Sequence, residues 1–115
     1  MCPIRKWTLF HGRAGDDTAQ VGVEPDGPGA VIRSQSWGPG VERSFGFDTL
    51  ETCLSLDGSA LVTLAHALVM DRPELDPTMS PIETLAAAYR GDSAATSHAR
   101  RRLDELSLPY ELTLR

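Results

Sequence analysis

The feature that most constrains this chain of 115 residues is a change of hydrophobic period near Asp57. Before Asp57, many apolar residues alternate with polar ones, which is the period of half-buried strands. After it, apolar residues recur at spacings of three and four, which is the period of amphipathic helices. The sequence therefore predicts an α+β fold, in which a sheet comes first, helices follow, and a closing strand returns to the sheet.

Five strands are expected before the change of period, in residues 4–10, 19–24, 30–36, 41–47 and 50–56. The strongest turn signal is Pro25-Asp-Gly-Pro-Gly29, because Pro fixes φ and Gly accepts a positive φ. The segment Val41–Phe47 is interpreted as a strand because its apolar side chains fall at even spacings. Short connections favour antiparallel neighbours, so a meander is the simplest topology.

Helices are expected between residues 59 and 106. Asp57 or Ser59 caps the first helix, which has a buried stripe at three- and four-residue spacings. Ser80-Pro-Ile-Glu83 is a capping box with Pro at the first helical position, and Gly91 ends the helix that it starts. These signals place helix boundaries more firmly than periodicity alone does.

A third helix is expected from Asp92 or Ser93 to residue 106, and Pro109 ends it. Residues 110–114 then alternate as a closing strand. The chain is predicted to be one domain, 1–115, with a mainly antiparallel sheet of five to six strands and two to three helices on one face. The opposite face is left for a loop, a ligand or a partner, and we expect function there.

Charge and hydropathy exclude several classes of function. The net charge is −5, and residues 42–92 hold nine acidic and three basic residues. Nucleic-acid binding needs an excess of Lys and Arg on one face, so we do not expect it. No apolar run approaches the ~20 residues of a membrane helix, and the N-terminus lacks the apolar segment of a signal peptide. The predicted location is therefore the cytoplasm, with no membrane partner.

No catalytic or metal-binding set can be nominated. The three histidines, His11, His66 and His98, show none of the helical spacings of a metal site. A composite site of His11 with Asp16 or Asp17 is possible in a turn, although such turn residues more often cap or solvate the backbone. There is no phosphate loop and no nucleophile elbow. No cofactor is predicted, and a binding function is favoured over catalysis.

The remaining candidate residues have mainly structural interpretations. Cys2 and Cys53 are too few for a disulfide framework or a zinc site, and Cys53 is expected to be a small buried or half-buried apolar side chain. The run Arg100–Arg102 is expected to form intrahelical ion pairs, Arg100 with Asp104 and Arg101 with Glu105. Trp37 follows a strand and precedes Gly-Pro-Gly. It can be an exposed interface anchor or can fold over the sheet end, and the sequence favours neither.

The segments Leu85-Ala-Ala-Ala-Tyr89, Gly91-Asp92, Arg102-Leu-Asp-Glu-Leu106 and Leu108-Pro-Tyr-Glu111 share one pattern. It is similar to the ending of many small actinobacterial proteins, in which a Gly-Asp break separates two helices and a Pro-Tyr-Glu strand follows. Some of those proteins are labelled immunity proteins of toxin systems. The resemblance covers about residues 80–114 and implies stoichiometric inhibition of a toxin. Its motifs are structural, so no functional residue is transferred by it.

We therefore expect a non-enzymatic binding protein, an immunity-type inhibitor of a toxin or other protein partner through an acidic surface. The residues expected to bind the partner are Trp37, Glu42, Asp48, Glu51, Asp71, Glu74 and Asp76. One alternative is a small-molecule-binding protein or small enzyme of a biosynthetic pathway, with a pocket between sheet and helices. Another is a structural homodimer that pairs through a sheet edge or a helical face.

Overall fold

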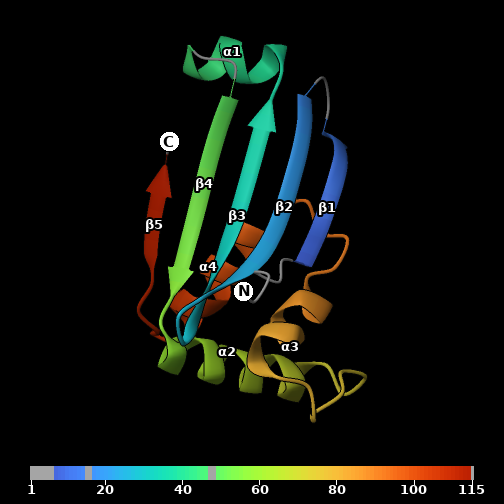
Figure 1. Cartoon of the computed structure of the whole chain (residues 1–115), viewed down its shortest axis with the longest axis vertical. Helices are drawn as coiled ribbons and strands as arrows, with labels where there is room; N and C mark the ends of the chain where they lie inside the picture. The colour runs from blue at the N-terminus through green and yellow to red at the C-terminus, as the bar shows by residue number, and fades with distance from the viewer. Residues whose placement is uncertain (1–6, 15–16, 47–48, 115) are drawn as a thin grey trace, which may run out of the picture.

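The computed structural model describes residues 7–14, 17–46 and 49–114. In these ranges the chain forms an antiparallel sheet and four helices, which confirms the α+β class (Figure 1). The strands are β1 (Trp7–Ala14), β2 (Asp17–Asp26), β3 (Gly29–Trp37), β4 (Thr49–Leu56) and β5 (Glu111–Leu114). The helices are α1 (Pro39–Phe45), α2 (Gly58–Asp71), α3 (Pro81–Ala88) and α4 (Ala95–Glu105).

The sheet is a meander with the strand order β1-β2-β3-β4-β5, and every neighbouring pair is antiparallel. The closing strand β5 pairs with residues 52–55 of β4 at one edge, as the sequence predicts. The turn between β2 and β3 brings Gly29 against the end of β4. A Cβ on Gly29 would lie 1.9 Å from the carbonyl oxygen of Leu56, so only glycine fits there.

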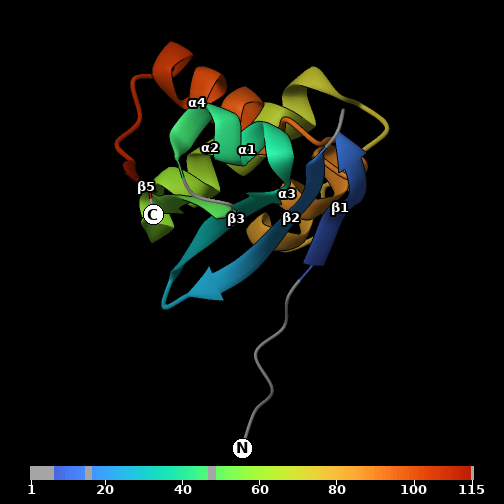
Figure 2. The ribbon, with the colours of Figure 1, turned by 90° about the horizontal axis from the view of Figure 1, so that it is seen from above.

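The helices lie on one side of the sheet. Figure 2 shows α1, α2 and α4 on the same side, and α3 contacts β1, β2 and α2. Alternate residues of the strands point to this side and form one apolar core with the inner faces of α2, α3 and α4. Its most deeply buried large side chains are Val21, Val23, Ile32, Leu54, Leu64, Leu85 and Leu103. The other face of the sheet is covered by no helix of the described chain.

Side-chain caps start two of the helices where the sequence predicts. Asp57 Oδ1 accepts a hydrogen bond from Ala60 N at 2.7 Å, which fixes the start of α2. Ser80 Oγ accepts from Glu83 N at 3.3 Å, and Ser80 Oγ donates to Glu83 Oε1 at 2.9 Å. The change of period near Asp57 is thus a real boundary between strand and helix.

The predicted strand over residues 41–47 is wrong, because residues 39–45 form helix α1. Pro39 occupies the first turn, and Gly46 ends the helix in the left-handed conformation at φ 78°. A contact distant in sequence accompanies the helix: Asp17 Oδ1 accepts from Gly40 N at 2.8 Å and from Val41 N at 3.4 Å. This carboxylate from β2 caps the helix, while Val41 becomes buried. The described sheet therefore has five strands, and there are more helices than the two to three predicted.

Two further details differ from the sequence prediction. Helix α4 begins at Ala95, after a turn in which Asp92 Oδ1 accepts from Ala94 N. Arg100 reaches Asp104 through a shared hydroxyl: its Nε donates to Tyr110 Oη at 3.2 Å, and Tyr110 Oη donates to Asp104 at 2.7 Å.

Among the described residues, none of the helices combines the length and the apolar character that a membrane crossing requires.

Candidate functional site

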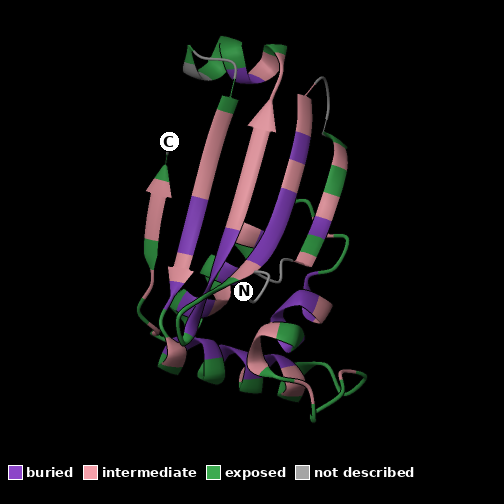
Figure 3. Ribbon diagram, viewed as in Figure 1, coloured by how far each residue is buried: buried purple, intermediate pink, exposed green. Residues whose placement is uncertain are grey.

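The candidate site is the face of the sheet that points away from the helices, which we call the open face. Its residues are those that alternate with the core positions of each strand. They include His11 and Arg13 of β1; Thr18, Gln20 and Glu24 of β2; Val31, Arg33, Gln35 and Trp37 of β3; Thr49, Glu51, Cys53 and Ser55 of β4; and Glu111 and Thr113 of β5. Most of these residues are neither fully buried nor fully exposed, and Figure 3 shows this intermediate burial along β5 and along the halves of β3 and β4 that lie towards α1.

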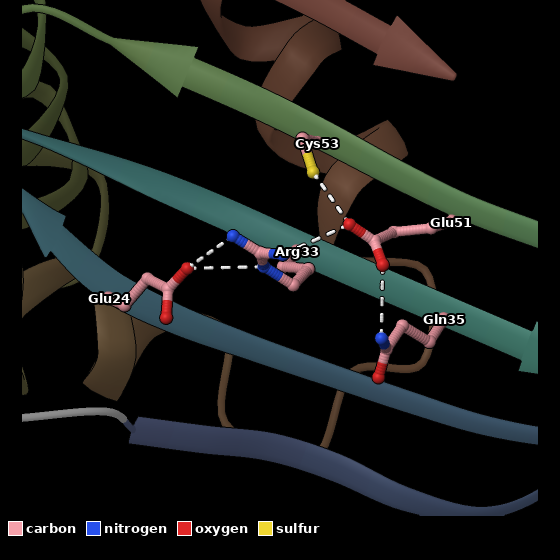
Figure 4. Close-up of polar contacts among 5 residues, drawn as sticks. All are labelled: Glu24, Arg33, Gln35, Glu51 and Cys53. Atoms are coloured by element: carbon pink, nitrogen blue, oxygen red, sulfur yellow. Dashed lines mark hydrogen bonds and ion pairs between the residues drawn. The ribbon is translucent and has the colours of Figure 1, made fainter. Parts of the chain in front are cut away.

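The centre of the open face is a hydrogen-bonded array around Arg33 (Figure 4). Arg33 donates to Glu24 Oε1 from Nε at 3.1 Å and from Nη2 at 2.7 Å, and to Glu51 Oε1 from Nη1 at 3.0 Å. Gln35 Nε2 donates to Glu51 Oε2 at 3.1 Å, and the Cys53 thiol donates to Glu51 Oε1 at 3.4 Å. The array thus ties three neighbouring strands together through side chains.

The register of the sheet explains why these five side chains meet. The cross-strand neighbours of Arg33 are Gly22 on β2 and Cys53 on β4, and both are small. Each such line of paired residues across the strands is called a row. The guanidinium can therefore reach Glu24 and Glu51 in the adjacent rows. The hydrogen bond to Glu24 raises the pKa of Arg33, and desolvation opposes this only in part. The cation is accordingly fixed between two carboxylates.

A hollow of about 410 Å³ lies where the open face meets the start of α1. It is lined by Trp37, Glu42 and Thr49 together with the Gly38-Pro39 turn. Trp37 and Thr49 are paired across β3 and β4. The next pair on the same face is Gln35 with Glu51, so the hollow adjoins these two side chains. Trp37 is half-buried as the last residue of β3, which lies between its two sequence-based interpretations.

A second hollow, of about 450 Å³, lies at the other end of the sheet. It is formed by the turn between β2 and β3, the end of β4 and the segment that leads into β5. Its acidic residues are Asp26, Asp57 and Glu111, and Tyr110 contributes an aromatic wall. Carboxylates are therefore present at both ends of the open face as well as at its centre.

The structure brings together three of the seven residues predicted to bind a partner. Trp37 and Glu42 line the same hollow, and Glu51 lies in the neighbouring row of the open face. Asp71, Glu74 and Asp76 lie elsewhere, at the end of α2 and in the loop after it. Asp48 is outside the described residues.

The second group of acidic residues is partly engaged within the chain. Asp71 forms an ion pair with Arg102 at 2.8 Å. Asp76 accepts from both the backbone N–H and the hydroxyl of Thr78, and these hydrogen bonds lower its pKa. Glu74 is exposed in the same loop. These three carboxylates therefore form a separate surface, and we do not include them in the candidate site.

The other chemical candidates do not converge on a site. Asp17 caps α1, His66 is exposed on α2, and His98 Nδ1 lies 2.5 Å from Asp92 Oδ2 near the start of α4. Within residues 7–14, 17–46 and 49–114, no three His, Cys, Asp or Glu side chains are grouped so that they could hold a metal ion. Cys2 and Asp16 fall outside the described residues. Cys53 is buried, as predicted, at 8% exposure.

Sequence reasoning missed Glu24, Arg33 and Gln35, which form most of the array. The available signal was their position: Glu24 lies on the polar side of the alternating segment 19–24, whereas Arg33 and Gln35 lie in a strand whose alternation is weak. That signal marks an open face but does not give the register between strands, which decides which side chains meet. Comparisons with protein-family models, with curated proteins and with solved structures find no match to this chain.

Proposed function

We propose that this chain is a non-enzymatic binding protein, an immunity-type inhibitor that covers a basic surface of a toxin or another protein partner. The observation on which this proposal rests is the open face, a five-stranded surface that no described helix covers and whose polar side chains are held in place. A surface already ordered in the free protein loses little conformational entropy when a partner binds.

The charge of the open face supports a basic partner. Its two described bases are Arg13 and Arg33, and Arg33 is already engaged by Glu24 and Glu51. Glu111 is a further acidic residue of the face, and additional carboxylates border the face at Asp26, Glu42 and Asp57. Opposite charge accelerates association and disfavours acidic competitors, which suits an inhibitor that must find its target quickly.

The Trp37 hollow supports a specific docking point within that face. An aromatic side chain beside an exposed carboxylate, Glu42, can receive the aliphatic stem and the cation of a Lys or Arg side chain. Tryptophan is also enriched among the residues that dominate binding energy at protein interfaces. We therefore expect Trp37 and Glu42 to contribute more to affinity than the rest of the face.

The test is capture of the partner from the native host, followed by binding measurements with the purified partner. We compare the wild type with Trp37→Ala and Glu42→Lys, and use Ser97→Lys, at an exposed position of α4, as the matched control. Both substitutions in the Trp37 hollow are expected to weaken binding by tenfold or more, about 1.4 kcal/mol. The wild-type association rate should fall as salt is added.

Three results would contradict the proposal. One is an equal loss of affinity in Ser97→Lys, another is full affinity in both Trp37→Ala and Glu42→Lys, and the third is turnover of a metabolite without any captured protein. For the inhibitor role in particular, the purified chain must abolish the activity of the captured partner at a stoichiometric ratio.

The alternative of a pocket between the sheet and the helices receives less support from the structure. The side chains that point into that space form the apolar core, with Ile32, Leu54 and Leu64 fully buried. The hollows described above lie at the ends of the sheet instead. A small-molecule role would therefore use a surface hollow, and we give it second place.

A further inference from the structure

Asp17 lies close to the Trp37 hollow, although its side chain points away from the open face. Asp17 and Thr18 are consecutive in β2, so their side chains point to opposite sides of the sheet. Thr18 pairs with Trp37 across β2 and β3 on the open face. The half-buried Asp17 is on the helix side, one residue away from that pair. It is therefore a neighbour of the candidate docking point without belonging to the surface that faces a partner.

The carboxylate of Asp17 holds the start of α1. Its Oδ1 accepts from Gly40 N at 2.8 Å and from Val41 N at 3.4 Å. The next residue along the helix is Glu42, whose side chain lines the hollow together with Trp37. The backbone that carries Glu42 is thus tied to β2 as well as to β3, the strand that ends in Trp37.

Helix α1 is short and is flanked by glycines in unusual conformations. It has seven residues, and its flanking residues Gly38 and Gly46 have φ values of 137° and 78°. Among the side chains of α1 that the structure describes, Val41 is the one that is buried. So short a helix is marginal by itself, and glycines allow the chain to change direction at its ends. The orientation of α1 therefore depends on tertiary contacts such as those of Asp17.

Gly40 is adapted to the contact with Asp17. A Cβ on Gly40 would lie 2.6 Å from Asp17 Oδ2 and 3.1 Å from Asp17 Cγ. The φ of Gly40 is not positive, so its backbone conformation does not require glycine. Alanine is intrinsically preferred over glycine within a helix. The glycine is consequently explained by the room that it leaves for the carboxylate.

From these observations we propose that Asp17 is a positioning residue for partner binding. Its carboxylate holds α1 so that Glu42 and Trp37 receive a cation of the partner from fixed positions. This role rests on the proposed function and deepens it, because it separates the residues that contact the partner from one that arranges them. A hollow formed before binding avoids the loss of apparent affinity that a partly populated binding conformation causes.

The experiment measures binding of a blocked peptide of three arginines through the fluorescence of Trp37. Every sample carries Trp7→Phe, so that Trp37 is its single tryptophan. Asp17→Ala should raise the dissociation constant of the peptide about three- to fivefold, which is the effect of one lost helix cap on the population of ordered α1. Asp17→Asn loses the same charge but keeps an acceptor oxygen, so its affinity should stay close to that of the wild type.

Gly40→Ala tests the same contact from its other side. Alone, the added methyl group should push the Asp17 carboxylate off the two N–H groups and raise the dissociation constant about as much as Asp17→Ala does. In the Asp17→Ala background the methyl group has room, so Gly40→Ala should cause no further loss of affinity. If helix propensity alone mattered, alanine would favour α1 in both backgrounds.

Two further measurements separate this role from a general loss of stability. Ser80→Ala removes the cap of α3, which lies at the other end of the sheet from α1 in Figure 1, and it should leave the dissociation constant unchanged. Amide hydrogen exchange reports on α1 without peptide, since Gly46 N donates to Glu42 O at 2.9 Å. The Gly46 amide should exchange faster in Asp17→Ala and in Gly40→Ala than in the wild type.

The outcomes distinguish this role from the proposed function. If Glu42→Gln weakens peptide binding but Asp17→Ala and Gly40→Ala do not, the positioning role is overturned and the proposed function stands. Unchanged exchange at Gly46 in Asp17→Ala overturns it as well, and so does an equal loss of affinity in Ser80→Ala. A wild type whose Trp37 fluorescence does not respond to the peptide overturns the docking point itself, together with the role of Asp17.

Discussion

The two faces of the sheet are made by the same strands, yet different interactions hold them. Ile32 and Arg33 are neighbours in β3 and point to opposite sides. Ile32 is fully buried among the helices, whereas the Arg33 side chain is 34% exposed and held by Glu24 and Glu51. The helix side is ordered by burial of apolar area, and the centre of the open face is ordered by charge-assisted hydrogen bonds.

This difference teaches where sequence change is tolerated. Burial depends on volume and shape, so the helix side should lose stability with any truncation. The open face contributes less to stability, so it can vary to suit a partner while the fold persists. The following predictions test that division, from the largest expected effect on stability to the smallest.

Truncation of the helix side should have the largest effect. Ile32→Ala removes a side chain with 0% exposure from the centre of the core, so the free energy of unfolding should fall by about 2–5 kcal/mol. Urea denaturation of the purified variant measures this loss. A change below about 1 kcal/mol would show that the core collapses around the cavity and would weaken the contrast between the two faces.

Disruption of the array should cost less than truncation of the core. Arg33→Met keeps an unbranched side chain but leaves Glu24 and Glu51 without their shared cation, so we expect a loss of about 1–2 kcal/mol. A double-mutant cycle with Glu24→Gln measures the interaction free energy between Arg33 and Glu24 apart from their other contacts. If Arg33→Met were as destabilising as Ile32→Ala, the array would be the main source of stability and the division would fail.

Removal of the cap on α1 should cost about 1 kcal/mol. Asp17 points to the helix side and accepts from the N–H groups of Gly40 and Val41, and Asp17→Ala leaves both donors without this acceptor. Asp17→Asn keeps an acceptor oxygen and should lose less. Urea denaturation compares the two variants; identical losses would mean that the carboxylate acts through its charge.

The smallest effect on stability is expected at Glu42. Its side chain is exposed in the first turn of α1, so Glu42→Gln should change the free energy of unfolding by less than about 0.5 kcal/mol. The same substitution should measurably lower the affinity for a basic partner. A variant that unfolds readily would show that Glu42 is part of the fold, and the binding comparison would then lose its meaning.

Helix α1 shows why part of the fold could not be predicted. The even spacing of its apolar residues favours a strand, and Pro39 and Gly46 favour a helix. These local signals conflict over a segment of only seven residues. The contact that accompanies the helix comes from Asp17 on β2, and no local pattern contains it.

The candidate site was predictable only in part for a related reason. Trp37, Glu42 and Glu51 stand out because an aromatic residue beside a Gly-Pro-Gly turn and acidic residues near it suit an interface. Arg33 does not stand out, since a single arginine in a strand is ordinary. Its importance depends on which carboxylates lie in the adjacent rows, and that follows from the pairing of β3 with β2 and β4.

The sequence alone determined the boundary at Asp57, the start of α2 to within two residues, the Ser80 cap of α3 and the strand character of the residues that form β5. These features depend on local periodicity and on side chains that bond their own helix ends, so neighbouring residues are enough to specify them. Only the tertiary structure decided the helical state of α1, the array around Arg33 and the separation of the acidic residues into two surfaces. Each of these depends on contacts between segments far apart in the chain, whose register is set by the packing of the whole domain.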